Sequence, residues 1–149
     1  NKNIFVINEV FDKQIVYSLF DCCDAYISLH RSEGFGIGMA ENMLLGKPVI
    51  CTGYSGNMDF CTSENSFLVD YSLIEVKNNE YISAEGFHWA DPSVLSASKL
   101  IEELYNSKSL VKSKTLAAKS NIENNFSVNG LANKFDQLIN NFMDSNSSS

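Results

Sequence analysis

Short apolar runs alternate with amphipathic helical segments along the first half of the chain, and this alternation constrains the fold more than any other feature. The apolar runs are predicted strands at residues 4–7, 25–29, 49–52 and 66–69. Each run is almost continuously apolar, which indicates strands that are buried on both faces. The helical segments between the runs can supply the crossovers that parallel strands require. The sequence therefore predicts an α/β fold with a parallel sheet flanked by helices.

Three helices of this predicted fold have recognisable ends. Asp12 can cap a helix whose inward face carries apolar residues three and four apart, namely Ile15, Val16, Leu19, Phe20 and Cys23. A second helix covers residues 37–45 and ends at Gly46. Asp91 followed by Pro92 predicts the start of a third, because a cap residue before a proline at the first helical position is a typical N-terminus. The predicted apolar face of this third helix is Val94, Ala97, Ile101 and Leu104.

The last third of the chain reads as helical. A polar helix is predicted for residues 110–125, and another begins at Ser127. The latter carries an apolar stripe of Val128, Leu131, Phe135, Leu138 and Phe142. This spacing is typical of core packing or of docking to another surface, and it does not choose between them. We expect one domain over residues 1–143 and a disordered polar tail over 144–149, while residues 74–89 are polar and suggest no regular element.

The charge and hydropathy of the chain argue against two classes of partner. Eleven Lys and Arg against 18 Asp and Glu give a net charge of −7, which disfavours nucleic acid and anionic membranes. No apolar run approaches the ~20 residues of a bilayer span. We expect a cytoplasmic protein, with the full-length form possible at a membrane surface. The chain begins with Asn1 and runs almost directly into a predicted strand, so we also expect a fragment or excised domain, truncated at its N-terminus.

The four cysteines do not form a recognisable metal-binding pattern. Cys22, Cys23, Cys51 and Cys61 include no C-x-x-C pair, and no histidine stands at ligand spacing from them. No metal site is therefore predicted. Buried free thiols in a reducing compartment are the preferred interpretation.

The loop after the predicted strand 25–29 has the composition of an anion site. Gly34 and Gly36 allow the backbone to approach a ligand closely just before a helix begins. The free N–H groups of such a turn, together with the helix dipole, suit a phosphate. The G-x-G-x-x-G dinucleotide fingerprint does not apply, because Met39 and Glu41 occupy the third glycine position in the two possible registers.

Two acids flank this turn. Glu33 precedes the glycines, and Glu41 lies eight positions further on, near the start of the helix. A carboxylate at the second position can accept hydrogen bonds from both hydroxyls of a vicinal diol, as an acid does for ribose in dinucleotide folds. Neither acid should face a phosphate, because like charges repel. The expected partners are sugar hydroxyls.

At this point the sequence resembles a known family. The segments S-E-G-F-G-I-G-M-A-E, M-L-L-G-K-P-V-I and T-G-Y-S-G-N-M-D-F are similar to those of retaining glycosyltransferases of the GT-B fold that carry the E-x7-E motif, the glycosyl transferases group 1. The resemblance covers most of residues 5–69, with weaker support from 88–92 and the C-terminal helices. It implies the Rossmann-like, donor-binding C-terminal half of a GT-B enzyme.

The resemblance also implies roles for individual residues. Glu41 would bind the ribose of a UDP- or GDP-sugar, and Glu33 would contact the transferred sugar near the reacting centre. Backbone N–H groups of the turn would hold the diphosphate or sugar hydroxyls, and the end of the loop 8–11 would pack the nucleobase. The residues implied for the turn are Gly34, Phe35, Gly36 and Ile37, and those implied for the base are Val10 and Phe11.

The implied reaction is hexosyl transfer with retention, without a metal or other cofactor, to a glycan or lipid-linked acceptor. The acceptor would be bound by an N-terminal domain that these residues do not include. The family's diphosphate-binding Arg and Lys have no counterpart among the 32 residues before Glu33, where Lys2 and Lys13 do not match. We therefore expect the isolated chain to be inactive. The alternative is a non-catalytic nucleotide-sugar-binding or partner-docking module.

Several residues admit a structural interpretation beside the functional one. Glu41 can be a helix former, and Glu33 a solvated acid paired with Arg31. His30, Arg31 and Asn57 are candidate contacts to the sugar or acceptor, but a strand-end histidine is more often structural. Asn57 also lies in a glycine-bracketed turn. Trp89 is expected to be a packed aromatic rather than a sugar platform.

Overall fold

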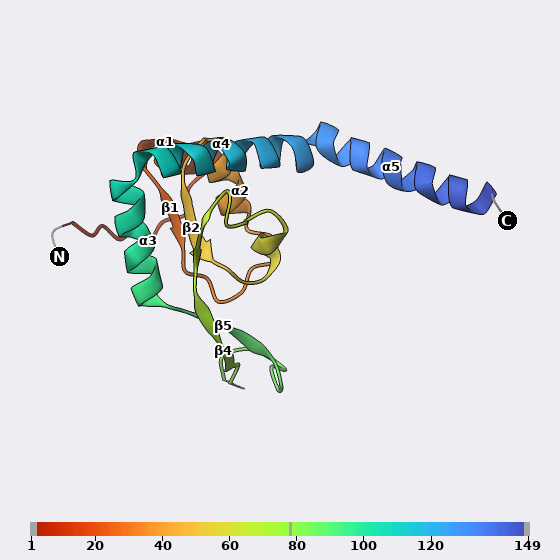
Figure 1. The fold of residues 1–149 in the computed structure, drawn as a ribbon. Helices are drawn as coiled ribbons and strands as arrows, with labels where there is room; N and C mark the ends of the chain where they lie inside the picture. Colours follow the sequence, from red (N-terminus) through yellow and green to blue (C-terminus); the bar gives the residue numbers. More distant parts are fainter. Residues whose placement is uncertain (1–2, 78, 148–149) are drawn as a thin grey trace.

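The computed structural model of the chain describes residues 3–77 and 79–147. Its centre is a parallel sheet in the order β1 (Tyr26–Ser28), β2 (Val49–Thr52) and β3 (Phe67–Val69) (Figure 1). Ile27 lies opposite Ile50, and Cys51 lies opposite Leu68. The predicted α/β class with a parallel sheet flanked by helices is confirmed.

Helices cover both faces of this sheet. Alternate residues of β2 point to opposite sides, so Val49 and Cys51 pack under α2 (Ile37–Leu44) and α4 (Lys108–Asn125), whereas Ile50 packs toward α3 (Val94–Asn106). The first cluster also buries Met39, Met43, Phe60, Cys61, Ala118 and Ile122. The second contains Phe67, Val69 and Ala97, with Leu100 and Leu104 against it. The β2 strand is therefore buried on both faces, as its apolar run predicted.

The first predicted strand is wrong. Residues 4–7 form no strand, and their side chains are exposed, from 57% for Ile7 to 88% for Val6. An extended apolar run becomes a strand only where a neighbour accepts and donates its backbone hydrogen bonds. No such pairing to this run exists in the described part of the chain. The apolar residues of this segment remain in solvent.

The helix after this segment begins where the sequence predicts. In α1 (Lys13–Cys22), the N–H of Ile15 donates to Asp12 Oδ1 at 2.9 Å. Of its predicted inward face, Val16 and Phe20 are half-buried, whereas Ile15, Leu19 and Cys23 are exposed. Phe20 packs edge-to-face on Tyr26 of β1 at 5.7 Å. The thiols of Cys22 and Cys23 are exposed, contrary to the expectation of four buried thiols, because α1 buries none of its residues completely. Cys51 and Cys61 are buried as expected.

A β-hairpin occupies the region that showed no sequence pattern. Strand β4 (Tyr71–Glu75) pairs antiparallel with β5 (His88–Pro92), with Glu75 opposite His88. The predicted helix start at Asp91–Pro92 is wrong, because both residues belong to β5. The cap of α3 is Ser93, whose Oγ accepts from the N–H of Ser96 at 3.1 Å. Tertiary pairing with β4 therefore outweighs a local helix-start signal.

The last helix projects away from the body of the molecule (Figure 1). This helix, α5 (Val128–Ser147), begins next to the predicted Ser127, and all five residues of its apolar stripe are at least 43% exposed. It continues to Ser147, into the segment expected to be a disordered tail, because each added residue of a formed helix gains one backbone hydrogen bond. Residues 148 and 149 lie outside the described residues. Within those described, no helix combines the length and apolar character needed to cross a membrane.

Candidate functional site

The glycine turn lies at the carboxyl end of β1 and forms the start of α2. Gly36 is the N-cap of α2 and has the left-handed backbone conformation, with φ of 94°. This left-handed conformation is what favours glycine at position 36, because the nearest atom to an added Cβ is the mobile terminal methyl of Met39. Among the described residues no side chain caps α2, although helix N-termini present several unpaired N–H groups. The arrangement suits an external anion.

The loop after β2 holds the backbone of Glu33 on both sides. Its N–H donates to Ser55 Oγ at 2.7 Å, and its carbonyl accepts from the N–H of Gly56 at 3.0 Å. A Cβ on Gly56 would lie 2.0 Å from the carbonyl oxygen of Gly34, so only glycine permits this approach. Neither Ser55 nor Gly56 was predicted to hold Glu33 in place. The available signal was the pair Gly53 and Gly56, which indicates a tight turn.

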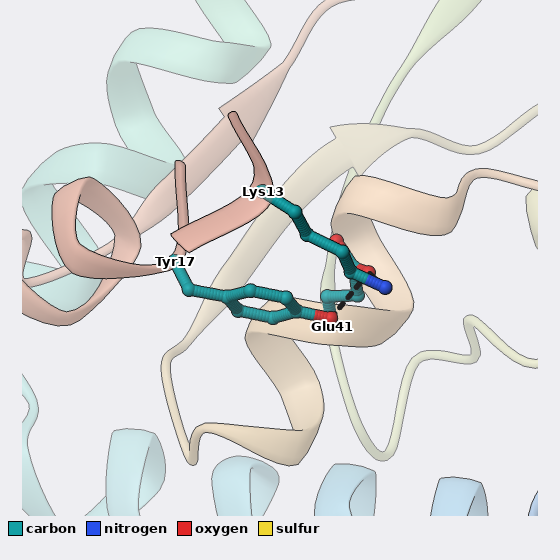
Figure 2. Close-up of polar contacts among 3 residues, drawn as sticks. All are labelled: Lys13, Tyr17 and Glu41. Atoms are coloured by element: carbon teal, nitrogen blue, oxygen red, sulfur yellow. Dashed lines mark hydrogen bonds and ion pairs between the residues drawn. The ribbon is translucent and has the colours of Figure 1, made fainter. Parts of the chain in front are cut away.

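Glu41 on α2 is held by two side chains from α1 (Figure 2). The hydroxyl of Tyr17 donates to Glu41 Oε1 at 2.5 Å, and Lys13 Nζ lies 3.8 Å from the same oxygen. This hydrogen bond to the carboxylate, with partial burial, raises the pKa of Tyr17. The Glu41 side chain is 20% exposed. Lys13 and Tyr17 were not predicted to lie here, although their spacing of four places them on one helix face.

Both acids act electrostatically on Tyr26 of β1. Burial raises the pKa of the Tyr26 hydroxyl, and the negative charges of Glu33 and Glu41 raise it further. The Tyr26 hydroxyl packs against Gly38, where a Cβ would lie 2.6 Å from it. The phenol of Tyr26 therefore lies against the first turn of α2.

This geometry agrees with a comparison to known families. A family model described as glycosyl transferases group 1 matches residues 1–121. The chain belongs to this family. It represents the C-terminal domain of the GT-B fold, the half that binds the donor, and membership implies a nucleotide-sugar donor. No significant match to a curated protein is found.

The turn of the glycosyltransferase domain carries two apolar side chains that differ in how they pack. The ring of Phe35 packs against Phe60 at 4.9 Å and Phe126 at 5.8 Å, which anchors the turn to the core. The side chain of Ile37 is 66% exposed, and nothing lies within 4 Å of a Cβ at Gly34. The turn is therefore anchored on one side and open on the other.

The residues implied for the nucleobase lie beside α1. Val10 is fully exposed and Phe11 is half-buried, immediately before the helix that carries Lys13 and Tyr17. Because Lys13 reaches Glu41, these residues and the acid implied for the ribose are at the same end of the site.

His30 and Asn57 form a network inside the protein. His30 Nδ1 lies 3.2 Å from Ser28 Oγ, and its Nε2 lies 3.1 Å from the carbonyl of Tyr54 and 3.0 Å from Asn57 Oδ1. Asn57 is fully buried and donates from Nδ2 to the carbonyl of Thr52 at 3.0 Å. These contacts favour the structural interpretation of both residues, because they join the loops after β1 and β2.

Arg31 is directed to the hairpin rather than to Glu33. Its guanidinium lies 3.7 Å from the Asp91 carboxylate and 5.1 Å from the ring centre of Trp89. The carbonyl of Arg31 accepts from the N–H of Ala90 at 2.9 Å. The indole of Trp89 is thus packed under a cation, as expected for a packed aromatic. Among the residues described, no three His, Cys, Asp or Glu side chains gather as a metal site requires.

Proposed function

We propose that this domain binds a UDP- or GDP-hexose across the N-terminus of α2. Glu41 accepts hydrogen bonds from the ribose hydroxyls, and Glu33 contacts the hexose near its reacting carbon. The N–H groups of Phe35, Gly36 and Ile37 hold the diphosphate. The observation that supports this proposal is a glycine at the N-cap of α2, with no side-chain cap among the described residues, between Glu33 in the preceding loop and Glu41 on the helix.

The charges of the site fit an anionic donor. Glu41 by itself would repel a diphosphate, but Lys13 lies 3.8 Å from its carboxylate and offsets part of that charge. The α2 dipole and its free N–H groups stabilise the negative charge that develops on the leaving diphosphate. In the proposed retaining transfer, the bond from the anomeric carbon to the diphosphate breaks. A bond to the acceptor hydroxyl oxygen forms on the same face, and the proton of that hydroxyl passes to the departing diphosphate.

The proposed acceptor is a glycan or a lipid-linked glycoconjugate bound with the help of another domain. The 149 residues by themselves are therefore expected to bind the donor without transferring the sugar. Val10 and Phe11 are the proposed contacts to the nucleobase, since they adjoin the end of the site where Lys13 meets Glu41.

Calorimetric titration of the chain with UDP, GDP and ADP tests the proposal. Glu41→Ala should weaken binding of the preferred nucleotide by about 1.5–3 kcal/mol, the range for hydrogen bonds to a charged group. Glu102→Ala, an exposed acid of α3, is the matched control and should leave affinity unchanged. Unchanged affinity in a folded Glu41→Ala variant would show that the ribose assignment is wrong.

The role of Glu33 is tested in a full-length protein that carries this domain. Glu33→Gln should reduce sugar transfer far more than donor affinity, because the proposed contact is near the reacting carbon. A full-length protein that binds the donor but transfers no sugar even with Glu33 intact would favour the non-catalytic alternative.

A further inference from the structure

The hairpin forms a pocket that the proposed donor site does not use. The cavity has a volume of about 520 Å³, within the range of small-molecule sites. Its walls include the aromatic side chains of Tyr81, Phe87 and Trp89. Ser32, the residue before Glu33, contributes to the same cavity. The pocket therefore adjoins the loop that carries the acid proposed to contact the sugar.

The hairpin is attached to that loop at several points. Ala90 donates its N–H to the Arg31 carbonyl, and the Arg31 side chain contacts both Asp91 and Trp89. On the other side, the rings of Tyr54 and Tyr71 pack at 5.1 Å. These contacts join β4 and β5 to the loops that follow β1 and β2. The pocket is consequently built against the site and does not lie on a detached projection.

The order of the elements indicates in which direction a bound donor would lie across the site. Glu41 faces α1 through Tyr17 and Lys13, whereas the hairpin follows β3 and lies beyond the carboxyl end of β2 (Figure 1). A donor with its ribose at Glu41 and its hexose at Glu33 therefore has its hexose directed toward the hairpin. The ligand expected beyond the hexose is the molecule that receives it.

The lining of the pocket indicates the chemistry of this ligand. The described lining contains no Asp, Glu, Lys or Arg, which disfavours a nucleotide or another charged ligand. The aromatic residues share the lining with the polar residues Ser32 and His88, a combination that matches the apolar faces and hydroxyls of a sugar ring.

We propose that the hairpin pocket binds a neutral saccharide of the acceptor, next to the hexose to be transferred. This inference rests on the proposed function for its direction, but the pocket and its lining are independent of the roles of Glu33 and Glu41. It assigns a share of acceptor recognition to the donor-binding domain.

Trp89 makes the proposal directly measurable. It is the single tryptophan of the chain, so intrinsic fluorescence reports on the pocket wall. The 149-residue chain is titrated with methyl glycosides of glucose, mannose and galactose and with maltose. At least one should give a saturable change. Phe87→Ala should weaken that response about tenfold through loss of an aromatic wall. Tyr105→Ala, an 82% exposed aromatic on α3, is the matched control and should respond as the unaltered chain does.

Separate measurements of nucleotide binding and glycoside binding distinguish a failure of this proposal from a failure of the proposed function. UDP binding, measured by calorimetry, should be unchanged in Phe87→Ala. If UDP binds but no glycoside gives a saturable response up to its solubility limit, the saccharide proposal is overturned and the donor proposal stands. If a glycoside binds and no nucleotide does, the saccharide pocket stands and the donor proposal falls.

Two further results would overturn the assignment to the acceptor. If UDP-glucose but not UDP displaces the glycoside, the pocket holds the sugar of the donor itself. If n-octanol gives a saturable response and no glycoside does, the pocket takes an alkyl chain instead of a sugar.

Discussion

The body of the molecule and the projecting helix α5 carry the same kind of apolar pattern with opposite results. In the body, defined as β1–β3 with α2, α4 and the segment 53–66 between β2 and β3, Met43, Ile50 and Phe60 are completely buried. On α5, Phe135 is 64% exposed and Phe142 is 67% exposed. Apolar residues at helical spacing therefore predict a helix but do not establish that its apolar face is buried.

Helix α4 is the converse case, since it has no apolar stripe and yet packs against the core. Its sequence is polar, yet Ala118 and Ile122 are buried against α2 and the sheet. Helix α5 has the clearer apolar stripe, but no strand lies beneath it (Figure 1). In this fold a helix is buried where it packs against the sheet, whatever the strength of its apolar stripe.

The largest effect is expected from removing one phenylalanine in each region. Phe60→Ala should lower the free energy of unfolding by about 3–5 kcal/mol, because it leaves a cavity among Phe35, Phe126 and Cys61. Phe135→Ala on α5 should change it by less than about 0.5 kcal/mol, as exposed substitutions usually do. Denaturant unfolding of both variants measures the difference. Equal losses would mean that α5 is as well packed as the body.

A smaller effect is expected for two glycines of the site. Gly56→Ala should destabilise the chain by about 1–3 kcal/mol, because its Cβ meets the backbone of Gly34. It should also separate the loop from Glu33. Gly34→Ala is the matched variant, since open space surrounds its Cβ position and its backbone is not left-handed, and it should leave stability nearly unchanged. A Gly56→Ala variant as stable as Gly34→Ala would show that the two loops are not held together.

The smallest expected effect is a change in the pKa of Tyr17 on α1. Glu41→Gln should lower the pKa of Tyr17, because it removes the carboxylate that favours the protonated phenol. Spectrophotometric titration of the tyrosines measures this change, with Tyr17→Phe to assign the transition and Glu102→Gln as the control. An unchanged titration would contradict the contact between Tyr17 and Glu41.

The sign of the related pH dependence follows from the raised pKa of Tyr26. The ordinary value is 10.0, and burial with the charges of Glu33 and Glu41 favours the neutral phenol in the folded protein. Its contribution to stability is therefore present below pH 10 and is lost as the pH rises through the folded value. Replacing Glu33 or Glu41 by a neutral residue should lower the pKa of Tyr26 in the folded protein, so that this stabilisation is lost at a lower pH.

Much of the framework followed from local sequence. Asp12 capped α1, Gly46 ended α2, and the runs 49–52 and 66–69 formed strands, because capping, turn geometry and continuous apolar character act over a few residues. The family match confirmed the group that the glycine turn and its two acids indicated. The roles of Glu33 and Glu41 remain predictions that the binding experiments test.

Contacts between distant segments were beyond the reach of local patterns. Tyr17 meets Glu41 across 24 positions, and Ser55 holds Glu33 across 22. Pairing with β4 made Asp91 and Pro92 strand residues. Residues 4–7 stayed outside the sheet because no strand in the described part of the chain pairs with them. Backbone propensity and capping are properties of neighbouring residues and can be read along the chain. Pairing and burial depend on which surfaces the folded chain brings together, and only the tertiary structure decided them.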